Sequence, residues 1–249
     1  MLSEERYQLI LQILNDRKAV TVSELSQQLD ISESTIRRDL NALAEMRKLN
    51  KVFGGATALN ENSGIFETNV ANRAVSMNEE KTAIGRYAAT LIGDDDFVFI
   101  DAGTTTLRMI DFLSNSKATF VTNGIIHGQM LIQKGLNAYM LGGRIKPLTE
   151  AVIGTMGVKS LENMNFTKAF MGTNGIDLSA GFTTPDIEEA KLKEAAISHS
   201  YRTYFLADHS KFRKVCAVTF APLKIGSIIT DDCPDNKYHE KTIIKEVKK

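Results

Sequence analysis

The chain has 249 residues, of which 43% are hydrophobic, and its 30 basic and 30 acidic residues give a formal net charge of zero at pH 7. This length allows one small and one larger domain, because domains typically contain about 100 to 200 residues. A neutral chain has no overall field that would hold it on DNA or on an anionic membrane, so any nucleic-acid contact must be local.

The two cysteines, Cys216 and Cys233, lie far apart and form no Cys-x-x-Cys or Cys/His motif, so we expect neither a metal site nor a disulfide framework. The opening segment MLSEERYQLILQIL has acidic residues where a signal peptide is basic, and no apolar run reaches the roughly 20 residues of a membrane span. We therefore expect a soluble cytoplasmic protein with no membrane partner and no cofactor.

The opening residues predict the first helices of a small domain. A helical stripe of apolar residues should end near Asp16. Its members are Leu2, Leu9, Ile10, Ile13 and Leu14. A short β-branched segment follows at Val20–Val22, and the pair Thr21 and Glu24 has the spacing of a capping box at the start of a second helix.

A third helix is predicted over residues 33–47, with Ser32 as its N-cap, and two helices joined by a tight turn are typical of a helix-turn-helix. Helical spacing places Ile36, Leu40 and Leu43 on its buried face. Short polar, amide and guanidinium groups occupy the opposite side, where they can bond to phosphates and base edges in a major groove. These candidate DNA contacts are Ser34, Thr35, Arg37, Arg38 and Asn41.

The two adjacent arginines allow two interpretations. Arg38 lies at the centre of the exposed face, where reading bases is expected, and Arg37 lies on its flank, where a phosphate contact is expected. Alternatively, both are surface cations that pair at helical spacing with an acidic neighbour. The acidic neighbours are Glu33, Asp39 and Glu45.

The segment RKLNKVFGGATAL predicts a small hairpin with a Gly54-Gly55 turn, which is favoured because both glycines can take positive φ. Arg47, Lys48 and Lys51 would place cations along its base, and we include Lys48 and Lys51 among the DNA contacts. Residues 37–51 contain five basic and two acidic residues, a local balance of +3 in a neutral chain.

The string SELSQQLDISESTIRRDLNALAEMRKLNKVFGGA resembles the winged helix-turn-helix of the DeoR family of bacterial transcriptional regulators. The recognition helix of that family carries the Thr-Ile-Arg-Arg-Asp-Leu string found here at Thr35–Leu40. The resemblance implies a mainly helical DNA-binding domain with a small β wing, at residues 1–58. Phe53 stands where the family commonly has histidine, so the phosphate contact of that histidine is not carried over.

Beyond a predicted linker at residues 59–77, strands alternate with helices, which predicts an α/β domain over residues 78–249 with a mostly parallel sheet covered on both faces. Ligands bind beyond the carboxyl ends of such strands. The segment DAGTTT, residues 101–106, combines a glycine with three hydroxyls at a helix start, which favours an anion site, although Thr104 could simply cap its helix. Similar polar or glycine-rich segments follow other strands, at Asn123, Gly142–Gly143, Asn174–Asp177 and Asp208–Lys211.

Residues 75–235 resemble the DeoR-type sensor domain, which is related in fold to ribose-5-phosphate isomerase, and this implies a phosphorylated sugar at the strand ends. The phosphate would lie on Gly103, Thr104, Thr105 and Thr106, with a cation from Lys81 or Lys211 unless those lysines are solvated surface residues. Asn123, Asp177 and Asp208 would bind sugar hydroxyls. The remaining candidates are Asp101, Gly142 and Gly143.

A sugar-phosphate isomerase is the alternative function. Its Asp-Gly-Ala-Asp-Glu segment and Lys-Gly-Gly-Gly loop are replaced here by NGIDL and SAGFTTPDIEEAKLKEA, which lack two acids and the lysine loop. Glu188, Glu189 and Lys191 are either remnants of such a site or the solvated face of a helix. We therefore expect a regulator and not an enzyme.

The branch of the family that the chain resembles most controls fructose uptake and phosphorylation. This implies a repressor released from operator DNA by fructose 1-phosphate, with tagatose 6-phosphate or another sugar phosphate as the alternative effector. One small domain makes few DNA contacts, so a homodimer or homotetramer on repeated half-sites is expected.

Overall fold

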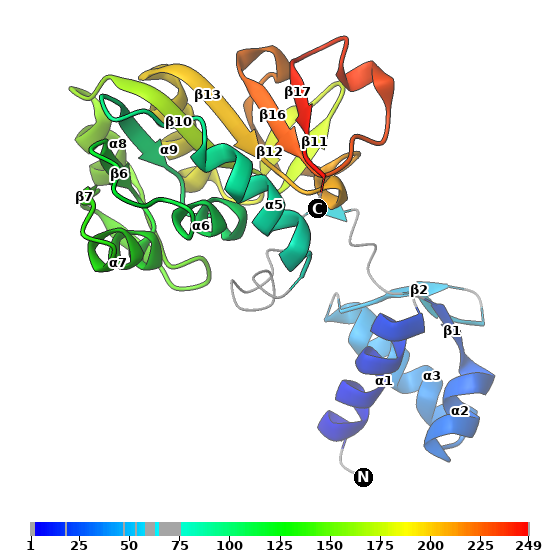
Figure 1. Cartoon of the computed structure of the whole chain (residues 1–249). Helices are drawn as coiled ribbons and strands as arrows, with labels where there is room; N and C mark the ends of the chain where they lie inside the picture. Colours follow the sequence, from blue (N-terminus) through cyan, green and yellow to red (C-terminus); the bar gives the residue numbers. More distant parts are fainter. Residues whose placement is uncertain are drawn as a thin grey trace. The chain divides into compact units, whose positions relative to one another are not determined.

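The computed structural model describes residues 3–17, 19–46, 48–52, 54–57, 63–64 and 76–248. The chain divides into two compact units, Met1–Ser63 and Gly64–Lys249, and each has a hydrophobic core of its own (Figure 1). Most of the predicted linker lies outside the described residues. None of the helices within the described ranges has the length and apolar character needed to cross a bilayer.

The first unit is a three-helix domain with a small antiparallel sheet in the order β1-β3-β2. Its elements are α1 (Ser3–Arg17), β1 (Ala19–Thr21), α2 (Val22–Leu29), α3 (Glu33–Glu45), β2 (Asn50–Val52) and β3 (Gly55–Thr57), and a short strand β4 (Ser63–Gly64) lies at the boundary between the units. The predicted capping box is present: Thr21 Oγ1 accepts from Glu24 N at 3.2 Å and Thr21 N donates to Glu24 Oε2 at 2.7 Å.

Several details of this unit differ from the sequence prediction. Leu9 is 39% exposed, so the buried stripe of α1 is narrower than expected. Val22 begins α2 instead of continuing a strand. Only Gly54 has a positive φ, of 78°, whereas Gly55 lies in β3, where a Cβ atom would come within 2.2 Å of the Val20 carbonyl oxygen. Leu2, Arg47 and Phe53 lie outside the described residues.

The second unit is built on a parallel sheet of seven strands in the order β17-β16-β13-β10-β5-β6-β7. The strands are β5 (Phe97–Ile100), β6 (Thr119–Thr122), β7 (Asn137–Met140), β10 (Phe166–Gly172), β13 (Ser200–Leu206), β16 (Ser227–Thr230) and β17 (Ile244–Glu246). The helices are α5 (Asn78–Ala89), α6 (Thr104–Ile110), α7 (Ile125–Gln133), α8 (Thr155–Leu161) and α9 (Ile187–Ser198).

The second unit also contains smaller strands and short helices outside the seven-stranded sheet. The hairpin of β8 (Arg144–Lys146) with β9 (Ala151–Ile153) is antiparallel, as is the sheet of β11 (Gly175–Asp177), β12 (Gly181–Thr184) and β15 (Val218–Ala221). The remaining elements are β14 (Val215–Cys216), η1 (His209–Lys211), η2 (Leu223–Ile225) and η3 (Asn236–Tyr238).

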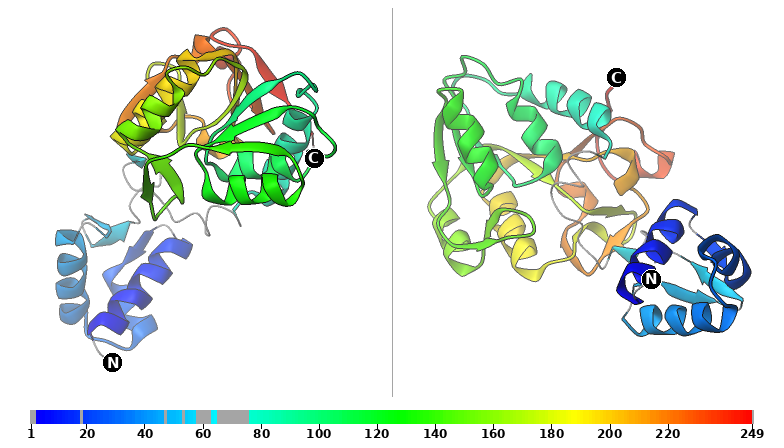
Figure 2. Two further views of the ribbon diagram at one scale, coloured as in Figure 1. Left: turned by 90° about the vertical axis from the view of Figure 1, so that its left-hand side faces the viewer. Right: turned by 90° about the horizontal axis from the view of Figure 1, so that it is seen from below.

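Side chains alternate between the two faces of the central strands, as the period of a strand requires. Phe99 packs in a core cluster with residues of α8 and α9, whereas its neighbours Val98 and Ile100 pack in a second cluster with residues of α5, α6 and α7. The views in Figures 1 and 2 show these two helical layers on opposite faces of the sheet. The predicted parallel sheet covered on both faces is therefore confirmed.

The strand order reverses between β5 and β10. The chain proceeds from β5 to β6 and β7 in one direction, and from β10 to β13, β16 and β17 in the other. The connections that leave neighbouring strands at such a point diverge and open a crevice at the carboxyl edge of the sheet. This switch point is where a ligand site is expected.

Candidate functional site

The polar side of α3, which we call the α3 polar face, consists of Ser34, Thr35, Arg37, Arg38 and Asn41. All of them are exposed except Thr35, which is half-buried. The buried side is formed by the predicted apolar residues, each with 0% exposure. Those residues are Ile36, Leu40 and Leu43.

The two arginines have different surroundings. Arg37 Nη2 donates to Glu33 Oε2 at 2.9 Å, but both side chains are largely exposed, so this pair stabilises the helix only weakly. Within the described ranges Arg38 makes no ion pair. Asp39, the neighbour of Arg38, is 2% exposed and accepts a hydrogen bond from Arg6 Nη2 at 2.9 Å. This bond connects α3 to α1. The interpretation as paired surface cations therefore describes Arg37 and not Arg38.

The N-terminus of α3 is held by a cluster of hydroxyls. Ser32 Oγ accepts from Thr35 N at 3.4 Å, and it lies 3.0 Å from Ser34 Oγ and 2.9 Å from Thr35 Oγ1. Lys48 and Lys51, beyond the other end of the helix, are both exposed. Of the predicted basic residues, Arg37 and Arg38 are thus exposed on α3, Lys51 on β2 and Lys48 between these elements, and Arg47 lies outside the described residues.

A solvent-open cleft of about 490 Å³, which we call the switch-point cleft, lies where the strand order reverses. It is lined by Asp101, Ala102, Gly103, Thr104, Thr105, Thr149, Gly172, Thr173, Asn174, Glu189, Lys193, Leu206 and Lys211. An adjoining hollow of about 320 Å³ shares part of this lining and extends it toward Leu107, Ile126 and His127. The loop after β5 is common to both hollows.

Five of the predicted effector residues line the switch-point cleft. They are Asp101, Gly103, Thr104, Thr105 and Lys211. Asp208, also predicted, lies next to Lys211 but is completely buried. Its Oδ1 accepts from Ser210 N at 3.0 Å. Its Oδ2 has no hydrogen-bond partner among the described residues and is 4.0 Å from Lys211 Nζ.

Two other predicted residues support the loop after β5, which lines the cleft. Thr106 is fully buried, and its Oγ1 donates to the Asp101 carbonyl at 2.6 Å and accepts from Gly103 N at 3.0 Å. Asn123 Oδ1 accepts from Ala102 N at 2.8 Å, and its amide nitrogen donates to the Val152 carbonyl. Both side chains hold the loop after β5 in place and do not line the cleft.

The remaining predicted residues are not brought to the cleft. Asp177 Oδ1 accepts from Ser179 N and Ala180 N in a turn, and Gly142 and Gly143 are exposed beyond the edge strand β7. Lys81 is neither in the cleft nor a solvated surface residue, because it is 2% exposed and donates to the Ser76 carbonyl at 2.7 Å.

The sequence prediction missed Lys193, which is 6% exposed and forms a buried ion pair with Asp101. Lys193 Nζ also donates to the Gly172 carbonyl at 3.3 Å, and Gly172 N donates to Asp101 Oδ2 at 2.8 Å. This network ties the ends of β5 and β10 to α9. Nothing in the local pattern of α9 distinguishes this lysine from its exposed neighbour Lys191.

Glu189, on the same helix, is buried, so the alternative that places this side chain on a solvated face is wrong. Its Oε1 accepts from Thr149 Oγ1 at 3.0 Å and from Lys146 Nζ at 3.2 Å, and its Oε2 accepts from Thr184 Oγ1 at 3.2 Å. Only Lys191 of the three possible isomerase remnants is fully exposed. Glu188 is half-buried and pairs with Arg144.

His127 supports the loop after β5 as a neutral imidazole. Burial lowers the pKa of this side chain to about 4, although the nearby Asp101 carboxylate acts in the opposite direction. Its Nε2 lies 3.1 Å from both the Gly103 carbonyl oxygen and Thr106 Oγ1. Gly124 is required beside it, because a Cβ atom there would approach His127 Nδ1 to 2.3 Å.

The lining of the switch-point cleft suits a small, polar, negatively charged ligand. Lys211 is a half-buried cation at its edge, and Gly103, Thr104 and Thr105 supply a close backbone approach and hydroxyls. The carboxylates of Asp101 and Glu189 accept bonds from neighbouring lysines and hydroxyls, so they are satisfied without a bound ligand.

Comparison with known proteins agrees with the description of the helix-turn-helix unit and with that of the α/β unit. Residues 6–62 match the model of the DeoR-like helix-turn-helix domain, and residues 76–232 match that of the DeoR C terminal sensor domain. The chain belongs to the DeoR family of transcriptional regulators. The resemblance predicted from the sequence is therefore confirmed.

Relatives of the DeoR family extend over the whole chain. The uncharacterized HTH-type transcriptional regulator FruR of Bacillus subtilis (strain 168) is 41% identical over 252 residues, which cover 100% of each chain. A lactose phosphotransferase system repressor of Staphylococcus epidermidis is 33% identical, with 92% of each chain covered. Among solved structures, ribose 5-phosphate isomerase A of Methanocaldococcus jannaschii is 13% identical, with a TM-score of 0.42 and 55% of each chain covered.

The family settles the choice between regulator and enzyme. The DNA-binding domain is present, and the full-length relatives are named as transcriptional regulators and repressors. The chain is therefore a DNA-binding transcriptional regulator of the DeoR family and not an isomerase.

Proposed function

We propose that the chain represses an operon for sugar uptake or catabolism in the cytoplasm and leaves its operator when a phosphorylated sugar binds the switch-point cleft. Fructose 1-phosphate is the favoured effector, with tagatose 6-phosphate as the alternative. The names of two relatives, FruR and a lactose phosphotransferase system repressor, support a sugar-linked role.

The observation that carries the effector proposal is the position and chemistry of the switch-point cleft. It lies at the carboxyl ends of β5 and β10, and its edge combines Lys211 with Gly103, Thr104 and Thr105. A phosphate group carries up to two negative charges and three acceptor oxygens, so a lysine and hydroxyl donors match it. Thr173 and Asn174, which follow β10 and also line the cleft, would supply polar groups for sugar hydroxyls.

The DNA side of the proposal rests on the α3 polar face. Arg38, Ser34 and Asn41 would contact base edges, and Arg37, Lys48 and Lys51 would contact phosphates. Thr35 lies at the N-terminal end of the same face. Because one such unit contacts few base pairs, a homodimer or homotetramer would bind repeated half-sites.

A thermal-unfolding screen tests the effector. Fructose 1-phosphate, tagatose 6-phosphate, unphosphorylated fructose and inorganic phosphate are added to the full chain. A ligand at 100 times its dissociation constant stabilises the folded protein by about 2.7 kcal/mol. We expect a rise in Tm with one of the sugar phosphates and none with fructose.

Two matched variants show whether a rise in Tm comes from binding in the switch-point cleft. Lys211→Met alters the cleft, and Lys224→Met is its control. Lys224 is exposed on η2 and does not line the switch-point cleft, so its variant should respond as the unaltered chain does. An equal response by the Lys211 variant, or no response to any sugar phosphate, would contradict the proposed site.

A further inference from the structure

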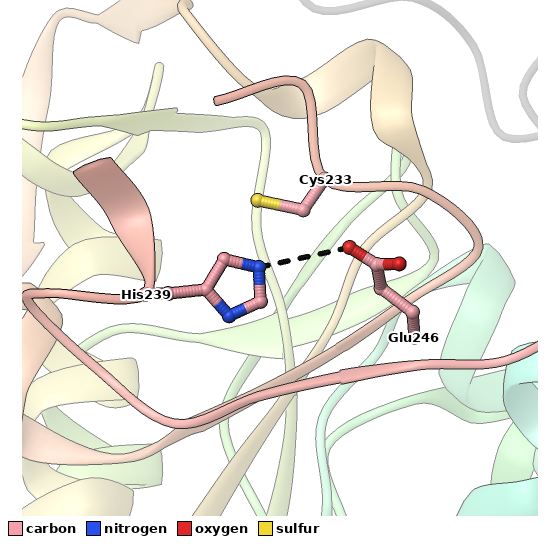
Figure 3. A group of neighbouring side chains, drawn as sticks. All are labelled: Cys233, His239 and Glu246. Atoms are coloured by element: carbon pink, nitrogen blue, oxygen red, sulfur yellow. Dashed lines mark ion pairs between the residues drawn. The ribbon is translucent and has the colours of Figure 1, made fainter. Parts of the chain in front are cut away.

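Three potential metal ligands meet near the C-terminal end of the second unit, away from the switch-point cleft. The Sγ of Cys233, an imidazole nitrogen of His239 and a carboxylate oxygen of Glu246 all lie within 4.8 Å of one another. Figure 3 shows the three side chains turned toward a common space, with His239 Nε2 3.7 Å from Glu246 Oε1. The sequence predicts no metal site, because Cys233 lies in the loop after β16, His239 directly follows η3 and Glu246 ends β17, and this spacing is not that of a known metal-binding motif.

The backbone at each of these positions is fixed by a buried neighbour. Tyr238, which precedes His239, is 1% exposed, and its hydroxyl lies 3.3 Å from the Ile176 carbonyl to which it donates. Val247, which follows Glu246, is also buried, and its N–H donates to the Thr230 carbonyl at 2.8 Å. Cys233 itself packs against the larger core cluster. The three donors are therefore presented by a stable scaffold.

The donor set has the chemistry of a zinc-type site. Zinc binds thiolate, imidazole and carboxylate at about 2.0 to 2.3 Å in tetrahedral geometry, which places ligand atoms about 3.3 to 3.8 Å apart. The present separations of up to 4.8 Å need to contract by about 1.0 to 1.5 Å at most, which rotation of the exposed His239 and Glu246 side chains can supply. A thiolate with an imidazole favours zinc and similar transition metals over magnesium or calcium.

The electrostatic surroundings also favour a cation. The carboxylates of Asp232 and Asp235, besides that of Glu246, place negative charge near the Cys233 Sγ. Burial and these carboxylates raise the pKa of the Cys233 thiol, so a metal ion must displace the thiol proton when it binds. An exposed pair between His239 and Glu246 would by itself stabilise the fold only weakly, and it does not require a thiol beside it.

We propose that Cys233, His239 and Glu246 bind one divalent ion of the zinc type, with water in the fourth position. The ion would join the C-terminal strand β17 to the loop after β16. That loop begins at Asp231, whose carboxylate holds His209 Nδ1 at 2.6 Å beside Asp208 and Lys211. Metal binding at this position would thus stabilise the wall of the second unit next to the effector residues.

Cobalt titration of the chelator-treated full chain tests the proposal. A thiolate–cobalt bond gives a charge-transfer band in the near ultraviolet, and four-coordinate cobalt gives strong visible bands. We expect both, saturating at one ion per chain and abolished by added zinc. Cys233→Ser should remove the charge-transfer band, and His239→Gln and Glu246→Gln should each weaken binding by at least about tenfold, since even residues outside the ligand set affect affinity that much.

Each variant has a matched control of the same residue type elsewhere in the chain: Cys216→Ser, His199→Gln and Glu240→Gln. These should bind cobalt as the unaltered chain does, and circular dichroism verifies that every variant is folded. The proposal is overturned if no thiolate band develops, if folded Cys233→Ser keeps the band, or if the controls lose cobalt as the three site variants do.

Discussion

At the scale of single residues, the arginines of α3 should make unequal contributions to DNA binding. Arg38 is exposed and, among the described residues, without an ion pair, whereas Arg37 is bonded to Glu33. Arg38→Ala should cost on the order of 1 to 3 kcal/mol and relax the preference at one base, because a base contact carries sequence information. Arg37→Ala should weaken binding to all sequences about equally. Fluorescence anisotropy on an operator and its single-base variants measures both effects.

Equal weakening for every sequence by Arg38→Ala would identify Arg38 as a phosphate anchor instead. The ion pair of Arg37 provides a further control, because Glu33→Gln frees that arginine without altering Arg38.

His127 should make stability depend on pH. Its folded-state pKa of about 4 lies below the ordinary value of 6.5, so the unfolded chain binds more protons between these values. The resulting contribution is present above pH 6.5 and is lost as the pH falls through the window toward 4, by about 3 kcal/mol in all. Urea unfolding of the unaltered chain and of His127→Gln at several pH values isolates the stability contribution of His127.

The carboxylates and the other histidines contribute equally to the pH dependence of stability in the unaltered chain and in His127→Gln, so their effect cancels in the difference. The stability contribution of His209 changes with pH in the opposite direction, because the hydrogen bond to Asp231 raises the pKa of His209. If the difference between the unaltered chain and His127→Gln were flat from pH 4 to 7, the neutral buried imidazole would be contradicted.

At the scale of elements, the buried pair of Asp101 and Lys193 should hold β5, β10 and α9 together. The two side chains are 2% and 7% exposed. Lys193→Met should destabilise the fold by about 3 to 5 kcal/mol, because it leaves the Asp101 carboxylate buried without its cation. The double variant Asp101→Asn/Lys193→Met should recover part of that loss. Chemical denaturation measures both, and a double variant as unstable as the sum of the single changes would exclude this coupling.

Much at the scale of elements could be predicted from the sequence. Helical spacing identified the buried residues of α3, and the capping pattern located the start of α2. Both signals are local: they depend on residues within one or two turns. The alternation of strands and helices likewise predicted the sheet and placed the loop after β5 at its carboxyl edge.

The side chains that complete the site could not be predicted in the same way. Lys193 and Asp101 are 92 residues apart, and Arg6 and Asp39 are 33 apart, so no local pattern marks them as partners. The Gly54-Gly55 turn was misjudged for a related reason, because the close approach of Gly55 to Val20 depends on the pairing of β3 with β1. Tertiary pairing of this kind decides which polar residues are buried.

At the scale of the whole molecule, a DeoR-like helix-turn-helix domain is joined to a DeoR C terminal sensor domain. Both DeoR-family domains are present in one chain, and relatives share this arrangement over their full length. Regulation then requires that the effector bind the DNA-released state more tightly than the DNA-bound state, with a coupling of about 1 to 3 kcal/mol. In the proposed function, the switch-point cleft would supply the groups for that binding, and the α3 polar face would supply the contacts that are lost.

The most direct test is the affinity of the full chain for operator DNA, measured by anisotropy with and without each sugar phosphate. One sugar phosphate should lower this affinity by about 5- to 150-fold. Lys211→Met should bind the operator normally but require much more effector for release, whereas Lys224→Met should behave as the unaltered chain does. An operator affinity that no sugar phosphate changes would contradict the account.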